Sequence, residues 1–136
     1  AAYMVHDVAR WARHYGLPFR MPSVFPANTI RALRGAVAAL QDGGFPAYHH
    51  AVMEAYWARN RDIGDRDVLA AVTRETGLDA ERLVARTEDA AVKDQLKANT
   101  DEAISRGVFG APTFFVGDAM YWGNDRLQFV EAALHG

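Results

Sequence analysis

Residues 107–127 read GVFGAPTFFVGDAMYWGNDRL, and at this stretch the hydrophobic periodicity of the chain changes from helical to extended. The β-branched and aromatic run 113–116 and a second apolar run, 119–122, flank Gly117-Asp118, a pair typical of a two-residue hairpin turn. The segment after the second run has an amphipathic helical pattern, with Leu127, Phe129, Val130 and Leu134 on one face. We therefore predict a strand-strand-helix unit over residues 107–136.

Upstream of this stretch the pattern is helical. Residues 17–27 hold three prolines and are predicted to form an extended loop. Six segments have the apolar spacing and the end signals of short amphipathic helices, beginning near Met4, Asn28, Pro46, Asp65, Asp79 and Asp89. Asn28 is expected to cap the second helix. The sequence thus predicts a helical domain over residues 3–106.

The predicted hairpin lacks partners in the sequence. An isolated two-stranded hairpin is marginal in water, and no third convincing strand precedes it. Either the hairpin packs on the helices alone, or its sheet partners lie outside this chain. We favour the second interpretation.

Composition excludes several classes of function. The 136 residues include 15 basic and 17 acidic side chains, a net charge of −2, which does not suit a nucleic-acid binder. No apolar run is long enough to span a membrane. The chain has no cysteine, so it supplies no disulfide and no thiol nucleophile, and its histidines lack metal-ligand spacing, so no metal site is expected.

Two segments near the hairpin are candidates for binding a small ligand. A cis bond before Pro112 turns the N–H and C=O of Ala111 outward as a free rung for an extended peptide. An ordinary trans proline at the start of a strand is the alternative, and it is favoured by these residues alone.

The second candidate segment is the turn from Trp122 to Asp125. Gly123 permits a tight bend, Asn124 or Asp125 is suited to cap the next helix, and the helix start favours an anion. The Asp125 carboxylate beside that anion site suits an ammonium group, so the pair fits an amino-acid head group. An ordinary capped helix remains the alternative. In the proline-rich loop, Phe25 is suited either to cover an apolar ligand or to lie over the core.

The order of these segments resembles the 2-hydroxychromene-2-carboxylate isomerases, relatives of kappa-class glutathione transferases in the thioredoxin-like group that includes the DsbA-type disulfide oxidoreductases. The likeness is clearest over 107–118 and 122–127, and Arg10-Trp11-Ala12, Tyr15-Gly16-Leu17-Pro18 and residues 25–29 fit it too. It implies an α/β, mostly helical, thioredoxin-like fold with a large helical insertion. In this chain that fold is represented by the helical domain, the hairpin and the last helix.

The resemblance also implies a site. It places a cis bond at Pro112, glutathione as the cofactor, and glutathione contacts at Ala111, Pro112, Trp122, Gly123, Asn124 and Asp125. It places Phe25 beside a small aromatic substrate of the kind met in naphthalene breakdown, although Phe25 lacks the hydroxyl that relatives often carry there. The implied reaction is a glutathione-dependent isomerisation.

The family's first strand-helix-strand unit, whose serine activates the glutathione sulfur, has no counterpart in this sequence. We therefore expect a truncated member with no catalytic residue of its own, inactive as an isolated chain. The alternatives are a DsbA-type thiol-disulfide oxidoreductase and a non-catalytic helical interaction module. We further expect a cytoplasmic protein that forms a homodimer or self-associates through its hairpin edge.

Overall fold

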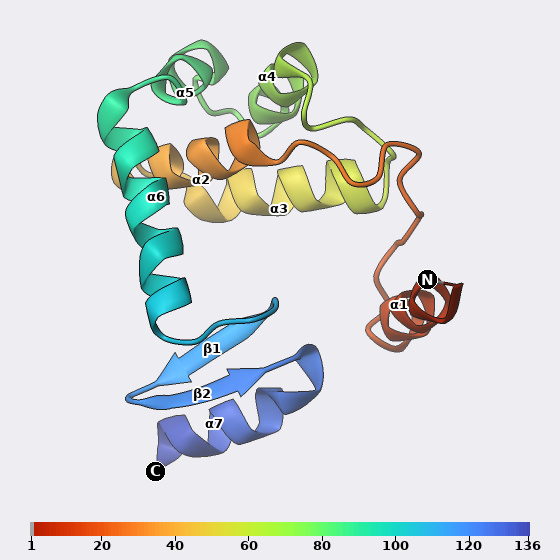
Figure 1. Ribbon diagram of the computed structural model, residues 1–136. Helices are drawn as coiled ribbons and strands as arrows, with labels where there is room; N and C mark the ends of the chain where they lie inside the picture. Colours follow the sequence, from red (N-terminus) through yellow and green to blue (C-terminus); the bar gives the residue numbers. More distant parts are fainter. Residues whose placement is uncertain (1) are drawn as a thin grey trace. The chain divides into compact units, whose positions relative to one another are not determined.

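The computed structural model describes residues 2–136, which divide into two compact units, one ending at Leu96 and the other spanning Lys97–Gly136. Figure 1 shows the order of the helices and strands along the chain: α1 Ala2–His14, α2 Ile30–Asp42, α3 Phe45–Trp57, α4 Arg66–Glu75, α5 Ala80–Arg86, α6 Ala90–Ser105, β1 Thr113–Val116, β2 Ala119–Trp122 and α7 Leu127–His135. The six upstream helices, the hairpin and the last helix predicted from the sequence are all present.

Side-chain capping explains where two of these helices begin. The Asp65 carboxylate accepts hydrogen bonds from the N–H groups of Asp67 and Val68 at the start of α4, at 2.8 and 2.9 Å. Asp79 caps α5 in the same way through the Arg82 N–H at 3.0 Å. These carboxylates satisfy N–H groups that have no partner within the helix.

The expected cap of α2 is wrong by one residue. Thr29 occupies the N-cap position and makes no side-chain capping bond. Asn28 lies one residue earlier, and its side-chain oxygen accepts from the Ile30 N–H at 3.2 Å. The amide therefore still supports the start of the helix, through a turn two residues long instead of a regular cap.

The core of the first unit is built where α2, α3, α4 and α5 pack against one another, as Figure 1 shows. Tyr48 of α3 is fully buried there, and its hydroxyl donates to the carbonyl of Ala32 on α2 at 2.9 Å. Gly35 on α2 faces the same ring, and a Cβ atom at this position would lie only 2.7 Å from Tyr48 Cζ. The absence of a side chain at Gly35 thus lets the two helices approach closely.

A smaller cluster joins α2 to the start of α6 through Val37, Ala38 and Val92, with Leu96 packed beside them. By contrast, no residue of α1 is buried, although the helix carries exposed Tyr3, Met4 and Val8.

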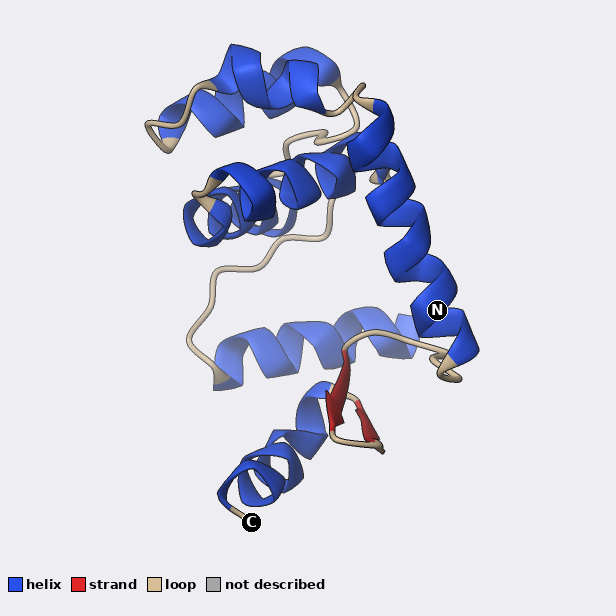
Figure 2. Ribbon diagram, turned by 90° about the vertical axis from the view of Figure 1, so that its left-hand side faces the viewer, coloured by secondary structure: helices blue, strands red, loops and turns tan. Residues whose placement is uncertain are grey.

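The second unit contains the predicted hairpin. Strands β1 and β2 are antiparallel with Thr113 opposite Trp122 and Val116 opposite Ala119, so the turn is Gly117-Asp118 as expected. Gly117 has a φ of 58°, which suits the first central position of a II′ turn. Helix α7 packs against β1. In Figure 2 these two short strands, drawn red, are the only strands within residues 2–136.

Arg106 supports this hairpin from outside the sheet. Its guanidinium lies 3.5 Å from the centre of the Phe115 ring, and it donates to the Gly117 carbonyl at 3.4 Å. A cation over an aromatic face is attracted to it, so Arg106 links the segment after α6 to both the strand and the turn.

Across residues 2–136, no helix combines the length and the apolar character that crossing a membrane requires.

The buried hydroxyl of Tyr48 leads to the first prediction. Burial raises the pKa of Tyr48 above its ordinary value of 10.0, so the neutral phenol stabilises the folded state. This contribution is complete below about pH 10 and is lost as the pH rises, because the unfolded chain ionises first. Tyr48→Phe should cost about 1 kcal/mol at pH 7 and should flatten the fall in stability above pH 10. Urea unfolding from pH 7 to 11 measures both, with the exposed Tyr15→Phe as the control. Parallel alkaline losses in the Tyr48→Phe variant and the unaltered protein would contradict the prediction.

Gly35→Ala is the second prediction. In an exposed helix this change usually stabilises by about 1 kcal/mol, but here the added methyl overlaps the Tyr48 ring. We expect a net loss of about 1–3 kcal/mol in the free energy of unfolding. The double variant with Tyr48→Phe should lose less than the sum of the two single variants, because the hydroxyl is one of the overlapping atoms. Simple additivity in a double-mutant cycle would argue against the proposed contact.

Candidate functional site

The hairpin register brings together the two segments singled out in the sequence. Thr113 lies opposite Trp122, and the Gly123 N–H donates to the Pro112 carbonyl at 3.0 Å. Ala111-Pro112 and Trp122-Gly123 therefore lie side by side, at the end of the hairpin opposite its turn.

The Ala111–Pro112 peptide bond is cis. This confirms the conformation that the family resemblance implied and corrects the interpretation favoured by the residues alone. Ala111 is exposed, and within residues 2–136 neither its N–H nor its C=O has a hydrogen-bond partner. Ala111 thus offers one donor and one acceptor to an extended ligand. A second cis bond, between Phe25 and Pro26, was not expected from the sequence.

Trp122 is half exposed and has a close neighbour that the sequence analysis missed. A Cβ atom at Gly110 would touch Nε1 of the indole and lie 3.2 Å from its Cε2. The Phe109 ring also lies near Trp122, with its centre 5.2 Å from that of the indole. The Thr113 hydroxyl donates to the Gly110 carbonyl at 2.6 Å and so holds this glycine near the indole. The signal in the sequence was a glycine immediately before Ala-Pro, which marks a close approach of the backbone.

The turn after Trp122 differs from the expected capped helix. Residues Asn124–Arg126 form a single 3₁₀ turn before α7, and neither N-cap residue, Gly123 or Arg126, makes a side-chain capping bond. The Asp125 carboxylate folds back over Gly123 and pairs with Arg126 at 2.7 Å. A side chain at position 123 would meet this carboxylate, and the φ of 105° there also favours glycine.

Asp125 is therefore a half-exposed carboxylate with one counter-ion in its own turn. A second cation can bind the same group from the solvent side, since a carboxylate accepts several hydrogen bonds. This is compatible with the predicted contact to an ammonium group. The roles of Ala111, Pro112, Trp122, Gly123, Asn124 and Asp125 as glutathione contacts stay predictions.

Phe25 belongs to the other unit. It is 54% exposed, and its ring centre is 6.3 Å from that of Trp57 at the end of α3, which itself packs against the core. Phe19 stacks on the same indole at 6.1 Å. The three rings form a local aromatic group, which sequence spacing had not linked to Phe25.

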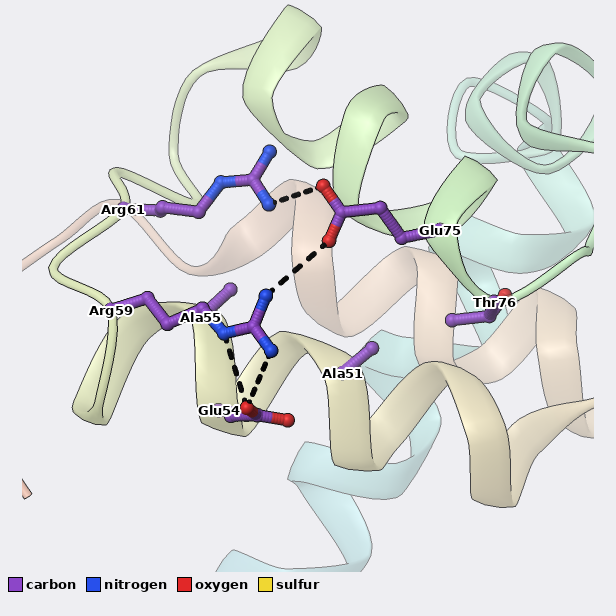
Figure 3. A pocket seen from close by; sticks show the side chains of 7 residues that line it. All are labelled: Ala51, Glu54, Ala55, Arg59, Arg61, Glu75 and Thr76. Atoms are coloured by element: carbon purple, nitrogen blue, oxygen red, sulfur yellow. Dashed lines mark hydrogen bonds and ion pairs between the residues drawn. The ribbon is translucent and has the colours of Figure 1, made fainter. Parts of the chain in front are cut away.

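The first unit also has a shallow cavity of about 150 Å³ between α3 and α4. Figure 3 shows that its charged residues pair with one another: Arg59 with Glu54 and Glu75, and Arg61 with Glu75. None of the residues predicted to bind a ligand lines this cavity. Its two cations and two anions balance, so it offers no net charge to a ligand.

No group of three or more His, Asp or Glu side chains within residues 2–136 is arranged to hold a metal ion.

Comparison with known proteins identifies the family of this chain. The DSBA-like thioredoxin domain model matches residues 1–135. The 2-hydroxychromene-2-carboxylate isomerase of Sphingobium xenophagum is 33% identical over 131 residues, covering 96% of this chain and 66% of that protein. Glutathione S-transferase kappa 2 of Caenorhabditis elegans is 31% identical over 148 residues, covering 94% of this chain and 63% of that protein.

Structural comparison agrees with the sequence comparison. A solved structure of a 2-hydroxychromene-2-carboxylate isomerase superimposes with a TM-score of 0.84 at 32% identity, over 98% of this chain and 65% of that one. The chain spans 62–66% of the length of the three curated isomerases that it matches. The expected resemblance and the DsbA-like thioredoxin fold are thus confirmed. Matched over almost its whole length, the chain belongs to the DSBA-like thioredoxin domain family.

Proposed function

We propose that this chain is part of a glutathione-dependent isomerase that acts on a small aromatic substrate of the 2-hydroxychromene-2-carboxylate type. One observation carries the proposal. The Ala111 backbone groups are free and exposed, and they lie next to the turn that bears Asp125. A tripeptide with a peptide backbone and an amino-acid head group has the chemistry to use both. The similarity to proteins named 2-hydroxychromene-2-carboxylate isomerase supports the choice of reaction.

Glutathione fits the residues present in this part of the chain. The free N–H and C=O of Ala111 suit the cysteinyl part of the tripeptide, as one antiparallel rung. The Asp125 carboxylate suits the γ-glutamyl ammonium, and the half-exposed Trp122 indole offers apolar surface to the ligand. When bound, glutathione supplies the nucleophilic sulfur for reversible addition to the substrate ring, chemistry that this cysteine-free chain lacks.

The aromatic substrate is assigned to the face of the helical unit that bears Phe25. Its exposed ring is backed by Trp57, which favours offset or edge contacts with a flat aromatic ligand. No hydroxyl is present at Phe25, so this residue contributes apolar contact area and no hydrogen bond.

The proposed function is tested by turnover of 2-hydroxychromene-2-carboxylate with and without glutathione, in the complete protein expressed from its gene. We expect isomerisation that depends on glutathione. Catalysed thiol-disulfide exchange without isomerisation would favour the oxidoreductase alternative. Neither activity, together with no heat of glutathione binding in calorimetry, would favour the interaction module.

Asp125→Asn is the third prediction. Replacing a charged acceptor of an ammonium group by a neutral one should weaken glutathione binding about tenfold or more, since such bonds contribute about 1.5–3 kcal/mol. Asp118→Asn is the matched control, because Asp118 is an exposed carboxylate at the hairpin turn, away from Asp125. Calorimetry with glutathione measures both affinities. Equal affinities in the two variants would remove Asp125 from the proposed site.

We also propose that the protein acts in the cytoplasm, where reduced glutathione is abundant, and that it self-associates. Both edges of the two-stranded sheet are unpaired within the described residues, and open edges favour strand pairing between chains. Sedimentation velocity should show a dimer or larger species at micromolar concentration, and cell fractionation should find the protein with cytoplasmic markers. A strictly monomeric protein, or one recovered outside the cytoplasm, would contradict these assignments.

A further inference from the structure

The loop that carries Phe25 is attached to the C-terminal end of α3. Residues 17–29, called the Phe25 loop below, contain no helix or strand. The Arg20 N–H donates to the Trp57 carbonyl at 2.7 Å, and the Tyr56 hydroxyl donates to the Val24 carbonyl at 3.0 Å. The loop is therefore bound to α3 on both sides of Ser23, immediately before Phe25.

Asn60 makes the third attachment. Its side-chain oxygen accepts from both the N–H and the hydroxyl of Ser23, at 2.6 and 3.0 Å. Asn60 also has a φ of 56°, and it is the one non-glycine residue within residues 2–136 with a positive φ. A left-handed backbone is costly for most side chains and is tolerated best by glycine and asparagine. An asparagine in this conformation combines the backbone geometry with a side-chain acceptor, which glycine does not provide.

The two chain neighbours of Asn60 form ion pairs. The neighbouring Arg59 pairs with Glu54 at 2.8 Å, and Arg61 pairs with Glu75 at 2.7 Å. Figure 3 shows these side chains converging from α3, α4 and the turn between them. The turn at residues 59–61 is thus held both by these ion pairs and by the Phe25 loop.

Trp57, the α3 residue to which the Phe25 loop is hydrogen-bonded, also makes aromatic contacts to this loop. Trp57 contacts both Phe19 and Phe25, with ring-centre distances of 6.1 and 6.3 Å. The Phe19 and Trp57 rings are nearly parallel, at 22°, whereas Phe25 is tilted by 57° to the indole. The orientation of the exposed Phe25 ring therefore depends on where the loop backbone is held relative to Trp57.

We propose that Asn60 is a positioning residue of the aromatic-substrate site. By holding Ser23, it keeps the Phe25 loop against Trp57 and presents the Phe25 ring in one orientation. A preordered ring spares the substrate the entropy cost of ordering it on binding. This inference rests on the proposed function for the binding of an aromatic ligand at Phe25, whereas the attachment of the loop by Asn60 is formed by contacts within the chain.

Three variants of the complete protein separate the side chain of Asn60 from its backbone. Asn60→Gly keeps the left-handed conformation and removes the acceptor. Asn60→Asp keeps an acceptor oxygen and is the conservative control. Ser23→Ala removes the hydroxyl donor and leaves the N–H donor in place, so its effect should lie between the other two.

Two measurements are needed. Hydrogen exchange reports the Ser23 amide, and we expect its protection to be lost in Asn60→Gly and retained in Asn60→Asp. Steady-state kinetics report the site: Asn60→Gly should raise KM for 2-hydroxychromene-2-carboxylate by about 3- to 10-fold, with a smaller change in kcat. KM for glutathione should be unchanged, and Asn60→Asp should restore the aromatic KM to within about twofold.

The outcomes distinguish this inference from the proposed function. Unchanged Ser23 protection in Asn60→Gly, or an unchanged aromatic KM despite lost protection, would overturn the role of Asn60. A parallel rise of both KM values would also overturn it, since that result indicates a general loss of structure. Absence of turnover in the unaltered protein would instead refute the proposed function, while hydrogen exchange would still decide whether Asn60 holds the loop.

Discussion

The hydrogen bond from the Gly123 N–H to the Pro112 carbonyl extends the hairpin ladder one step beyond its strands, and the candidate glutathione site depends on it. With this register, the backbone of Ala111 lies beside the turn that carries Asp125. A slip of one residue would turn every side chain of the strand to the opposite face and would separate Trp122 from Gly110. Two further features stabilise this strand pairing: the turn at Gly117, and the contacts of Arg106 to Phe115 and to the Gly117 carbonyl.

The two units obtain their order from different interactions. The helical unit has a buried core, in which Tyr48 lies against Gly35 and satisfies its hydroxyl on the neighbouring helix. Its Phe25 loop is attached by hydrogen bonds to Tyr56, Trp57 and Asn60, at the end of α3 and just after it. In the hairpin unit no residue of β1, β2 or α7 is buried, so hydrogen bonds and the Arg106–Phe115 contact carry more of its stability. Few buried contacts usually mean a lower free energy of local opening.

Features that depend on neighbours in the chain were predictable. Asp65 and Asp79 cap helices because a short carboxylate reaches N–H groups two or three residues on, and Gly117-Asp118 turns the hairpin for an equally local reason. The predicted helix caps were wrong where the same residues can form either a regular cap or a tighter turn. Asn28 supports α2 from one residue earlier than expected, and the turn at Asn124 and Asp125 tightens into a 3₁₀ turn instead of being capped.

The sequence alone therefore determined the order of the helices, the hairpin register and the segments that bear the candidate site, because periodicity, capping and turn chemistry act over a few residues. The family resemblance added the cis bond at Pro112, which the residues by themselves did not favour. Only the tertiary structure decided that Asn60 holds Ser23, 37 positions upstream, that Trp57 backs Phe25, and that Gly110 must be bare to admit the Trp122 indole. Such contacts join residues far apart in the chain, and their geometry is set by how whole helices and strands pack, which no local pattern encodes.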